Sequence, residues 1–131
     1  MKFYDFVTGV LKTFTKLFFK FEVIGGENIP HEGAIILAAN HRSNLDPVFL
    51  AACMHKNRPI KAVAKKELFK IKPLGYILNK LNVIPVDRNN PTASTIKNIL
   101  KVLRAKECLG MFPEGTRNKG TGFLEAKAGL G

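Results

Sequence analysis

Two short polar segments carry the residues with the most informative chemistry. Residues 40–46 read Asn-His-Arg-Ser-Asn-Leu-Asp, and residues 112–117 read Phe-Pro-Glu-Gly-Thr-Arg. In the first segment, His41 is a candidate general base and Asp46 is a carboxylate that can orient it. In the second, Arg117 and a flexible glycine offer a site for an anion. A base combined with an anion site suggests chemistry on a phosphorylated alcohol.

His41 and Asp46 are five residues apart and can meet only where the backbone turns between them. On a helix this spacing separates the side chains by about 140°, and on a strand it puts them on opposite faces. Asp46 followed by Pro47 is typical of a helix N-cap and first helical position. Asp46 can then accept a hydrogen bond from Nδ1 of His41 and leave Nε2 free as a base. The alternative is that Asp46 only caps a helix and His41 is an ordinary loop residue.

The second segment follows a predicted strand and has the composition of a phosphate-binding turn. Gly115 lets backbone approach a ligand, Thr116 adds a donor, and Arg117 can bind phosphate through two hydrogen bonds. Glu114 is unusual in an anion site, where it can hold an arginine in place or contact a substrate hydroxyl. Arg88, in an Asp-Arg-Asn-Asn loop, is a second phosphate candidate. The alternative for both loops is an ordinary charged, solvated turn.

Strand and helix patterns alternate after residue 20 and must position these loops. Strands are predicted at 21–24, 34–39, 60–64, 83–86 and 108–112, and helices at 47–53, 73–81 and 92–104. Pro85 indicates that the fourth of these strands lies at an edge or an end. The alternation predicts an α/β fold with a mostly parallel central sheet flanked by helices. Ligand sites in such sheets lie beyond the carboxyl ends of strands, where the polar loops fall, so the loops can converge.

Residues 1–20 have the pattern of an amphipathic helix. Lysines interrupt a set of apolar residues that recur at three- and four-residue steps: Phe3, Phe6, Val7, Val10, Phe14, Leu17, Phe18 and Phe21. A lysine at the membrane centre costs about 2.5–3.5 kcal/mol, so a spanning helix is not expected. The pattern favours a helix at a membrane interface. The alternative is that its phenylalanine face docks on the protein's own domain or on a partner.

Composition limits the classes of fold and of binding partner that remain possible. The chain has 131 residues, 46% of them hydrophobic, which predicts one domain with a buried core. Its net charge of +11 attracts polyanions such as anionic lipid, phosphorylated substrates or nucleic acid. Cys53 and Cys108 have no metal-binding spacing and form no disulfide framework, which favours a reducing cytoplasmic setting. Without a serine nucleophile motif, direct attack by a substrate hydroxyl is simpler than a covalent intermediate.

Taken in order, the motifs resemble those of the glycerolipid acyltransferases. Residues 41–46 resemble the family's His-x4-Asp motif, residues 84–88 (Ile-Pro-Val-Asp-Arg) its second motif, and residues 112–117 its third. The similarity is greatest to the 1-acylglycerol-3-phosphate (lysophosphatidic acid) acyltransferases, which make phosphatidic acid. The similarity covers about residues 20–131, so we expect residues 21–131 to form the acyltransferase domain and residues 1–20 to form the preceding amphipathic membrane-interface helix.

The resemblance implies a mechanism and a set of site residues. His41 takes the proton from the free hydroxyl of lysophosphatidic acid, and Asp46 orients His41. The hydroxyl attacks the thioester of acyl-CoA or acyl-carrier protein, with no metal or other cofactor. The residues implied to bind the acceptor phosphate are Arg88, Glu114, Gly115, Thr116 and Arg117. Acyl transfer to glycerol-3-phosphate or to another lysophospholipid is the alternative.

The resemblance also implies where the protein acts. Substrate and product are membrane lipids, so we expect a peripheral protein on the cytoplasmic face of the cell membrane, held by anionic lipid. No nucleic acid is expected as a partner, because no recognition motif accompanies the charge. The family's fourth motif lies downstream of the third, and the chain ends at Gly131 before it. We therefore expect a C-terminally truncated product, with an inactive fragment that only binds anionic lipid as the alternative to an enzyme.

Overall fold

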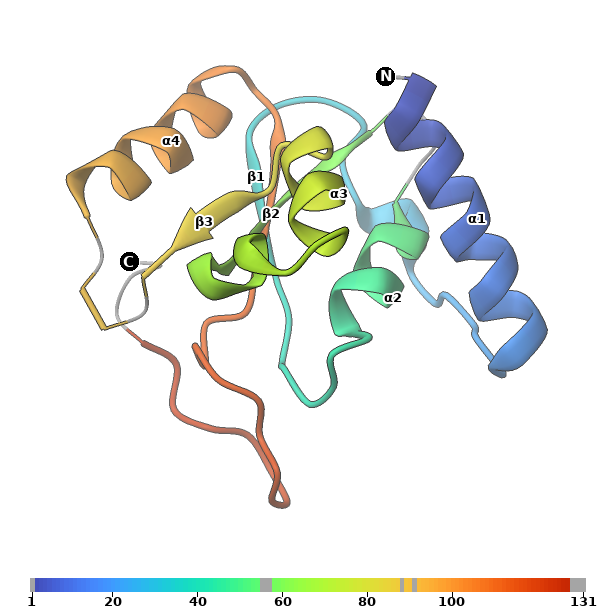
Figure 1. Ribbon diagram of the computed structural model, residues 1–131. Helices are drawn as coiled ribbons and strands as arrows, with labels where there is room; N and C mark the ends of the chain where they lie inside the picture. Colours follow the sequence, from blue (N-terminus) through green and yellow to red (C-terminus); the bar gives the residue numbers. More distant parts are fainter. Residues whose placement is uncertain (1, 55–57, 88, 91, 128–131) are drawn as a thin grey trace.

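The computed structural model describes residues 2–54, 58–87, 89–90 and 92–127. Its strands are β1 (Ile35–Ala38), β2 (Ile60–Lys65), β3 (Ile84–Val86) and β4 (Cys108–Met111). Its helices are α1 (Lys2–Phe18), α2 (Asp46–Cys53), α3 (Leu74–Lys80) and α4 (Ala93–Arg104), with 3-10 turns at Gly26–Asn28 and Lys66–Lys70. Figure 1 shows the predicted architecture, an α/β fold with a parallel sheet and an N-terminal helix.

The sheet order is β1-β4-β2-β3, and all described pairings are parallel. β4 therefore lies between β1 and β2, although it is the last of these strands in the sequence. β1 and β4 end in register, with Ala38 opposite Met111. Because of this register, the two polar loops that follow β1 and β4 start side by side at the carboxyl ends of these strands.

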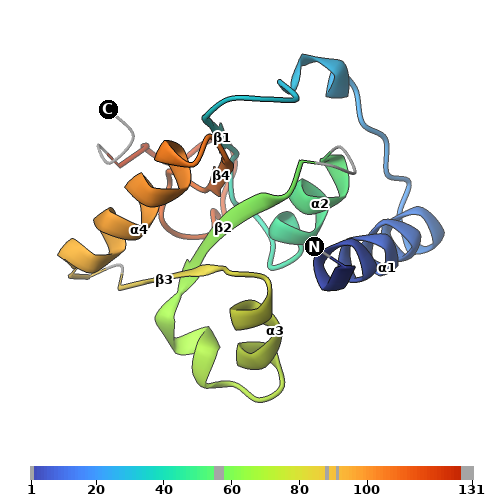
Figure 2. The same cartoon turned by 90° about the horizontal axis from the view of Figure 1, so that it is seen from above.

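Helices cover both faces of the sheet (Figure 2). Successive residues of β4 point to opposite faces, and Cys108 and Leu109 are both fully buried. Cys108 joins a core with Ile60 and Met54 near α2, whereas Leu109 joins a core with Ile84 and Val102 near α4. Burial on two sides explains the apolar run of the central strand β4. It does not explain the apolar run of β1, an edge strand in which Ile36 and Ala38 are exposed.

One predicted strand is wrong. Residues 21–24 form no strand, and the other predicted elements are confirmed with shifts of one or two residues at their ends. The apolar residues after α1 instead pack as a connector, with Phe19 and Phe21 both against Phe49 of α2 at ring-centroid distances of 5.3 and 5.4 Å. Pro85 lies in β3, at the edge of the sheet, as its missing N–H predicts.

Helix α1 packs on α2 through its more polar face. The backbone N–H of Ile60 donates to the Tyr4 hydroxyl at 2.9 Å, and Lys12 Nζ donates to the carbonyl of Met54 at 2.8 Å. Thr15 is fully buried in the same face. Phe6, Phe14 and Phe18 are exposed. Phe3, at the start of the helix, is half-buried, and Nζ of Lys80 in α3 lies 5.3 Å from its ring centroid. Among the described residues, no helix is long and apolar enough to cross a membrane.

Candidate active site

The loop between β1 and α2 folds around a single carboxylate oxygen. Oδ2 of Asp46 accepts hydrogen bonds from Nδ1 of His41 at 2.8 Å, from the N–H of Arg42 at 2.6 Å and from the N–H of Ser43 at 2.7 Å. The predicted turn between His41 and Asp46 is thus present. The predicted N-cap is shifted, because Leu45 takes that position and Asp46 is the first residue of α2. The Asp46 side chain organises the preceding loop instead of capping its own helix.

These contacts set the protonation state of Asp46. Burial alone raises the pKa of a carboxyl group, but the hydrogen bonds from Ser43, His41 and Arg42 outweigh it, and the pKa of Asp46 is lowered from its ordinary value. Asp46 is therefore ionised at neutral pH and keeps the proton of His41 on Nδ1. In the neutral imidazole, Nε2 is then the nitrogen with the lone pair, and no described residue forms a hydrogen bond to it.

The segment after β4 fixes His41 from the other side. The N–H of His41 donates to Oε1 of Glu114 at 2.9 Å, and its carbonyl accepts from the N–H of Asn118 at 2.7 Å. The imidazole stacks on Phe112, with ring centroids 4.3 Å apart and planes inclined by 19°. Only 7% of His41 is exposed. The His41 ring is therefore held in one orientation by these contacts.

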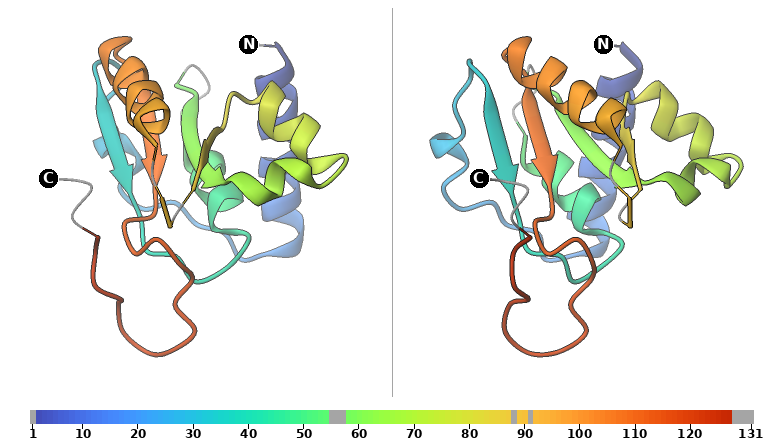
Figure 3. Two further views of the ribbon diagram at one scale, coloured as in Figure 1. Left: turned by 60° about the vertical axis from the view of Figure 1, so that its left-hand side comes forward. Right: turned by 90° about the vertical axis from the view of Figure 1, so that its left-hand side faces the viewer.

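Glu114 joins the two loops. The residue is 5% exposed, and its second carboxylate oxygen accepts from the N–H of Leu124 at 3.1 Å. In the structure this side chain holds the backbone of the loop that carries His41, and neither of these two contacts is with the Arg117 side chain considered from the sequence. Figure 3 shows both loops at the same end of the sheet, beyond the arrowheads of β1 and β4.

Residues 112–117 form a tight turn beside His41. The N–H of Gly115 donates to the carbonyl of Phe112 at 3.0 Å, and the φ of Gly115 is +66°, in the left-handed region that favours glycine. Thr116 and Arg117 are exposed at the end of this turn, whereas Glu114 is buried. The structure thus brings the first and third motifs together and leaves two of the predicted phosphate-binding side chains open to solvent.

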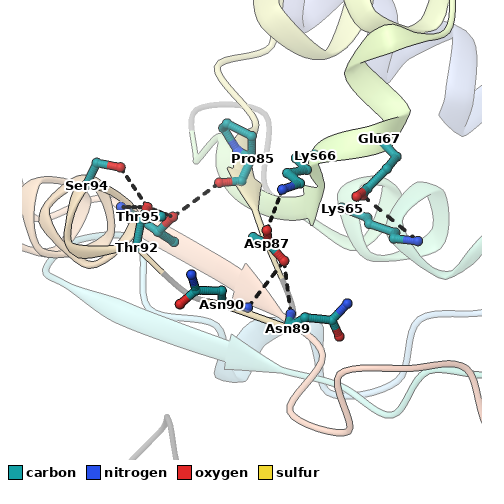
Figure 4. A network of polar contacts seen from close by, with 10 residues as sticks. All are labelled: Lys65, Lys66, Glu67, Pro85, Asp87, Asn89, Asn90, Thr92, Ser94 and Thr95. Atoms are coloured by element: carbon teal, nitrogen blue, oxygen red, sulfur yellow. Dashed lines mark hydrogen bonds and ion pairs between the residues drawn. The ribbon is translucent and has the colours of Figure 1, made fainter.

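The second motif forms a separate network at the carboxyl end of β3. Arg88 lies outside the described residues. Its neighbour Asp87 forms an ion pair with Lys66 and accepts from the N–H groups of Asn89 and Asn90 at 3.0 and 3.3 Å (Figure 4). The hydrogen bond with Lys66 lowers the pKa of Asp87 and raises the pKa of Lys66. Among the described residues, none of these contacts reaches the loops around His41.

Sequence reasoning missed the contributions of Asn118 and Phe112. Asn118 is 6% exposed, its Nδ2 donates to the carbonyl of Gly122 at 2.7 Å, and its Oδ1 accepts from the N–H of Gly120 at 2.8 Å. An asparagine followed by glycines two and four residues later is a signal for such a side-chain-closed turn. The stacking of Phe112 on His41 has no comparable local signal.

The fold and the site define an α/β protein with an aspartate-oriented histidine available as a general base. Residues 20–131 match the sequence model of the acyltransferase family, and the chain belongs to this family. Individual relatives and a solved structure are also similar to the chain.

The chain is 37% identical over 114 residues to a 1-acyl-sn-glycerol-3-phosphate acyltransferase of Bacillus subtilis (strain 168), covering 87% of this chain and 57% of that protein. It is 38% identical over 107 residues to the protein of the same name from Streptococcus pneumoniae (strain R6), covering 77% of this chain and 40% of that protein. The crystal structure of the 1-acyl-sn-glycerophosphate (LPA) acyltransferase PlsC from Thermotoga maritima superposes with a TM-score of 0.75 and 27% identity, over 95% of this chain and 51% of that one. The chain thus spans about half the length of these relatives.

Proposed function

We propose that this chain carries the catalytic centre of an acyltransferase that esterifies the free hydroxyl of lysophosphatidic acid and so forms phosphatidic acid. The observation that carries the proposal is the contact between Nδ1 of His41 and Asp46, with Nε2 left without a partner among the described residues. The names of the relatives support the choice of acceptor. Because the chain spans about half of those relatives, the activity is proposed for the protein that contains it.

In the proposed reaction, Nε2 of His41 removes the proton from the acceptor hydroxyl as its oxygen attacks the thioester carbonyl carbon. The resulting imidazolium is stabilised by the ionised Asp46 at Nδ1. The tetrahedral intermediate then collapses, the carbon–sulfur bond breaks, and the imidazolium returns the proton to the leaving thiolate. The products are an ester and a free thiol, and His41 is again neutral. The acyl donor is acyl-CoA or acyl-carrier protein, and both supply the same thioester.

The acceptor phosphate is proposed to bind at the turn after β4. Thr116 and Arg117 are exposed there and offer a hydroxyl and a guanidinium, and Gly115 keeps the backbone free of a side chain. Arg88, which lies outside the described residues, is proposed as a further cation from the second motif. Glu114 contributes indirectly, because it holds the turn against the backbone of His41.

We expect the purified protein to form phosphatidic acid from lysophosphatidic acid in mixed micelles, with one free thiol released per ester formed. Parallel reactions with acyl-CoA and acyl-carrier protein identify the donor, and glycerol-3-phosphate and monoacylglycerol in place of lysophosphatidic acid identify the acceptor. Mass spectrometry of the lipids and a thiol reagent give the two readouts. Absence of ester with both donors, or equal turnover of the acceptor that lacks phosphate, would contradict the proposal.

We also propose that α1 holds the protein on the cytoplasmic face of the membrane as a peripheral protein. Its outer face exposes Phe6, Val10, Phe14, Leu17 and Phe18, which is unusual for a helix that packs on its own domain. These side chains suit the acyl boundary of a bilayer, and the net charge of +11 suits anionic headgroups.

Replacing Leu17 and Phe18 by serine is expected to weaken binding to vesicles that contain anionic lipid by at least about tenfold, because full burial of each side chain contributes about 1.5–3 kcal/mol. Vesicle co-sedimentation measures the change. The matched control is Ile96→Ser, which removes an exposed apolar side chain from α4 on the other side of the sheet. Equal binding of the double variant and the control would exclude α1 as the membrane contact.

A further inference from the structure

Lys127 lies against the turn that is proposed to bind phosphate. The chain leaves the turn after Arg117, runs outward and returns, and the N–H of Lys127 donates to the carbonyl of Pro113 at 2.9 Å (Figure 1). On the return, the Lys127 side chain crosses Gly115. A Cβ atom at position 115 would lie 3.0 Å from Cε and 3.1 Å from both Cδ and Nζ of Lys127. The absence of a side chain at Gly115 therefore provides the space that the lysine occupies.

The ammonium group of Lys127 is not neutralised within the described part of the chain. Lys127 is exposed, and no described carboxylate lies within ion-pair distance of its Nζ. The carboxylate within the turn, Glu114, uses its two oxygens for the N–H groups of His41 and Leu124. Arg42 is already engaged, because its Nη2 donates to the carbonyl of Gly120 at 3.0 Å. Lys127 and Arg117 are thus two cations at one turn, adjacent to the proposed base.

We propose that Lys127 binds the phosphomonoester of the acceptor together with Arg117. This inference rests on the proposed function, and it adds a residue that lies ten positions beyond the third motif. A phosphomonoester carries close to two negative charges at neutral pH and three acceptor oxygens, so two cations from different segments match it better than one. Gly115 then serves the site by leaving room for the lysine.

The test compares Lys127→Gln with Lys119→Gln, which removes the same charge from an exposed lysine in the same loop. For Lys127→Gln, kcat/KM for lysophosphatidic acid is expected to fall about tenfold to a hundredfold, mostly through KM, because a charge-assisted contact is lost. Turnover of monoacylglycerol, measured with the same acyl donor, is expected to change less than twofold. Binding of glycerol-3-phosphate without any donor, measured by calorimetry, is expected to weaken by the same factor as kcat/KM. Circular dichroism verifies that both variants fold.

The other outcomes separate this inference from the proposed function. If the wild type converts lysophosphatidic acid and Lys127→Gln behaves as Lys119→Gln does, Lys127 is not a phosphate-binding residue and the proposed function stands. If Lys127→Gln loses activity equally on the acceptor without phosphate, its effect is on the donor or on the loop, and the inference is overturned. If the wild type neither binds glycerol-3-phosphate nor forms phosphatidic acid, both are overturned.

Discussion

Replacing His41 with alanine is expected to lower acyl transfer by at least about a thousandfold, within the 10²–10⁴ range of a general base. The variant removes Nε2, which the proposed mechanism uses both to activate the hydroxyl and to protonate the leaving thiolate. The loop should survive, because Glu114 and Asn118 hold the backbone of residue 41 through its N–H and carbonyl groups. Initial rates of phosphatidic acid formation measure the loss, and thermal unfolding tests the fold.

His31→Ala is the control for the His41 variant. It removes a histidine that precedes β1 and therefore lies near the amino end of this strand, whereas His41 follows its carboxyl end. This control is expected to retain the wild-type rate. A His41→Ala protein with a rate within a few-fold of the wild type would show that another group removes the proton, and the assignment of His41 would have to be abandoned.

Local sequence signals were sufficient to predict the contact between His41 and Asp46. His41 and Asp46 are five residues apart, and the short polar stretch between them allows one carboxylate oxygen to collect three hydrogen bonds. Apart from the strand predicted at 21–24, the strands and helices were also predictable, because most strands are short apolar runs and α4 has a clear helical stripe after its Thr92 cap. These features depend on residues close together in the chain.

The role of Glu114 depends on residues far apart in the chain and could not be predicted. Its contact with the His41 backbone joins residues 73 positions apart and exists only because β1 and β4 are neighbours in register. The position of Lys127 over Gly115 has the same origin, since the returning chain is placed by a backbone hydrogen bond to Pro113. The motifs identify residues, but they do not distinguish the side chains that contact a ligand from those that hold the loops in place.

The orientation of α1 shows a different limit. Apolar periodicity predicts an amphipathic helix, and the usual inference is that the apolar face is buried in the domain. Here polar residues lie on the face that packs against the domain, because the Tyr4 hydroxyl and the Lys12 ammonium find backbone partners at β2 and at the end of α2. Periodicity measures how residues segregate around a helix, and it does not identify the surface that each face contacts.

Replacing Asp46 with asparagine is expected to lower kcat about a hundredfold, whereas replacement with alanine should approach the loss of His41→Ala. All three hydrogen bonds end on one oxygen, so the asparagine carbonyl can take its place and keep the turn and the histidine tautomer. Asparagine then removes mainly the negative charge that stabilises the imidazolium. Alanine also frees the ring and leaves the N–H groups of Arg42 and Ser43 without their acceptor.

The stability of these variants tests the same contacts without turnover. Asp46→Ala should lower the free energy of unfolding by about 1–2 kcal/mol, as for loss of a helix cap, and Asp46→Asn by less. Because the folded pKa of Asp46 is lowered, its stabilising charge is fully present above the unfolded pKa of about 3.9 and is lost as the pH falls through the folded value. The stability difference between wild type and Asp46→Asn should therefore be constant above about pH 5 and shrink in more acidic solution. A difference that grows on acidification would mean that folding raises the pKa of Asp46, and the carboxylate could not then act as the ionised partner of His41.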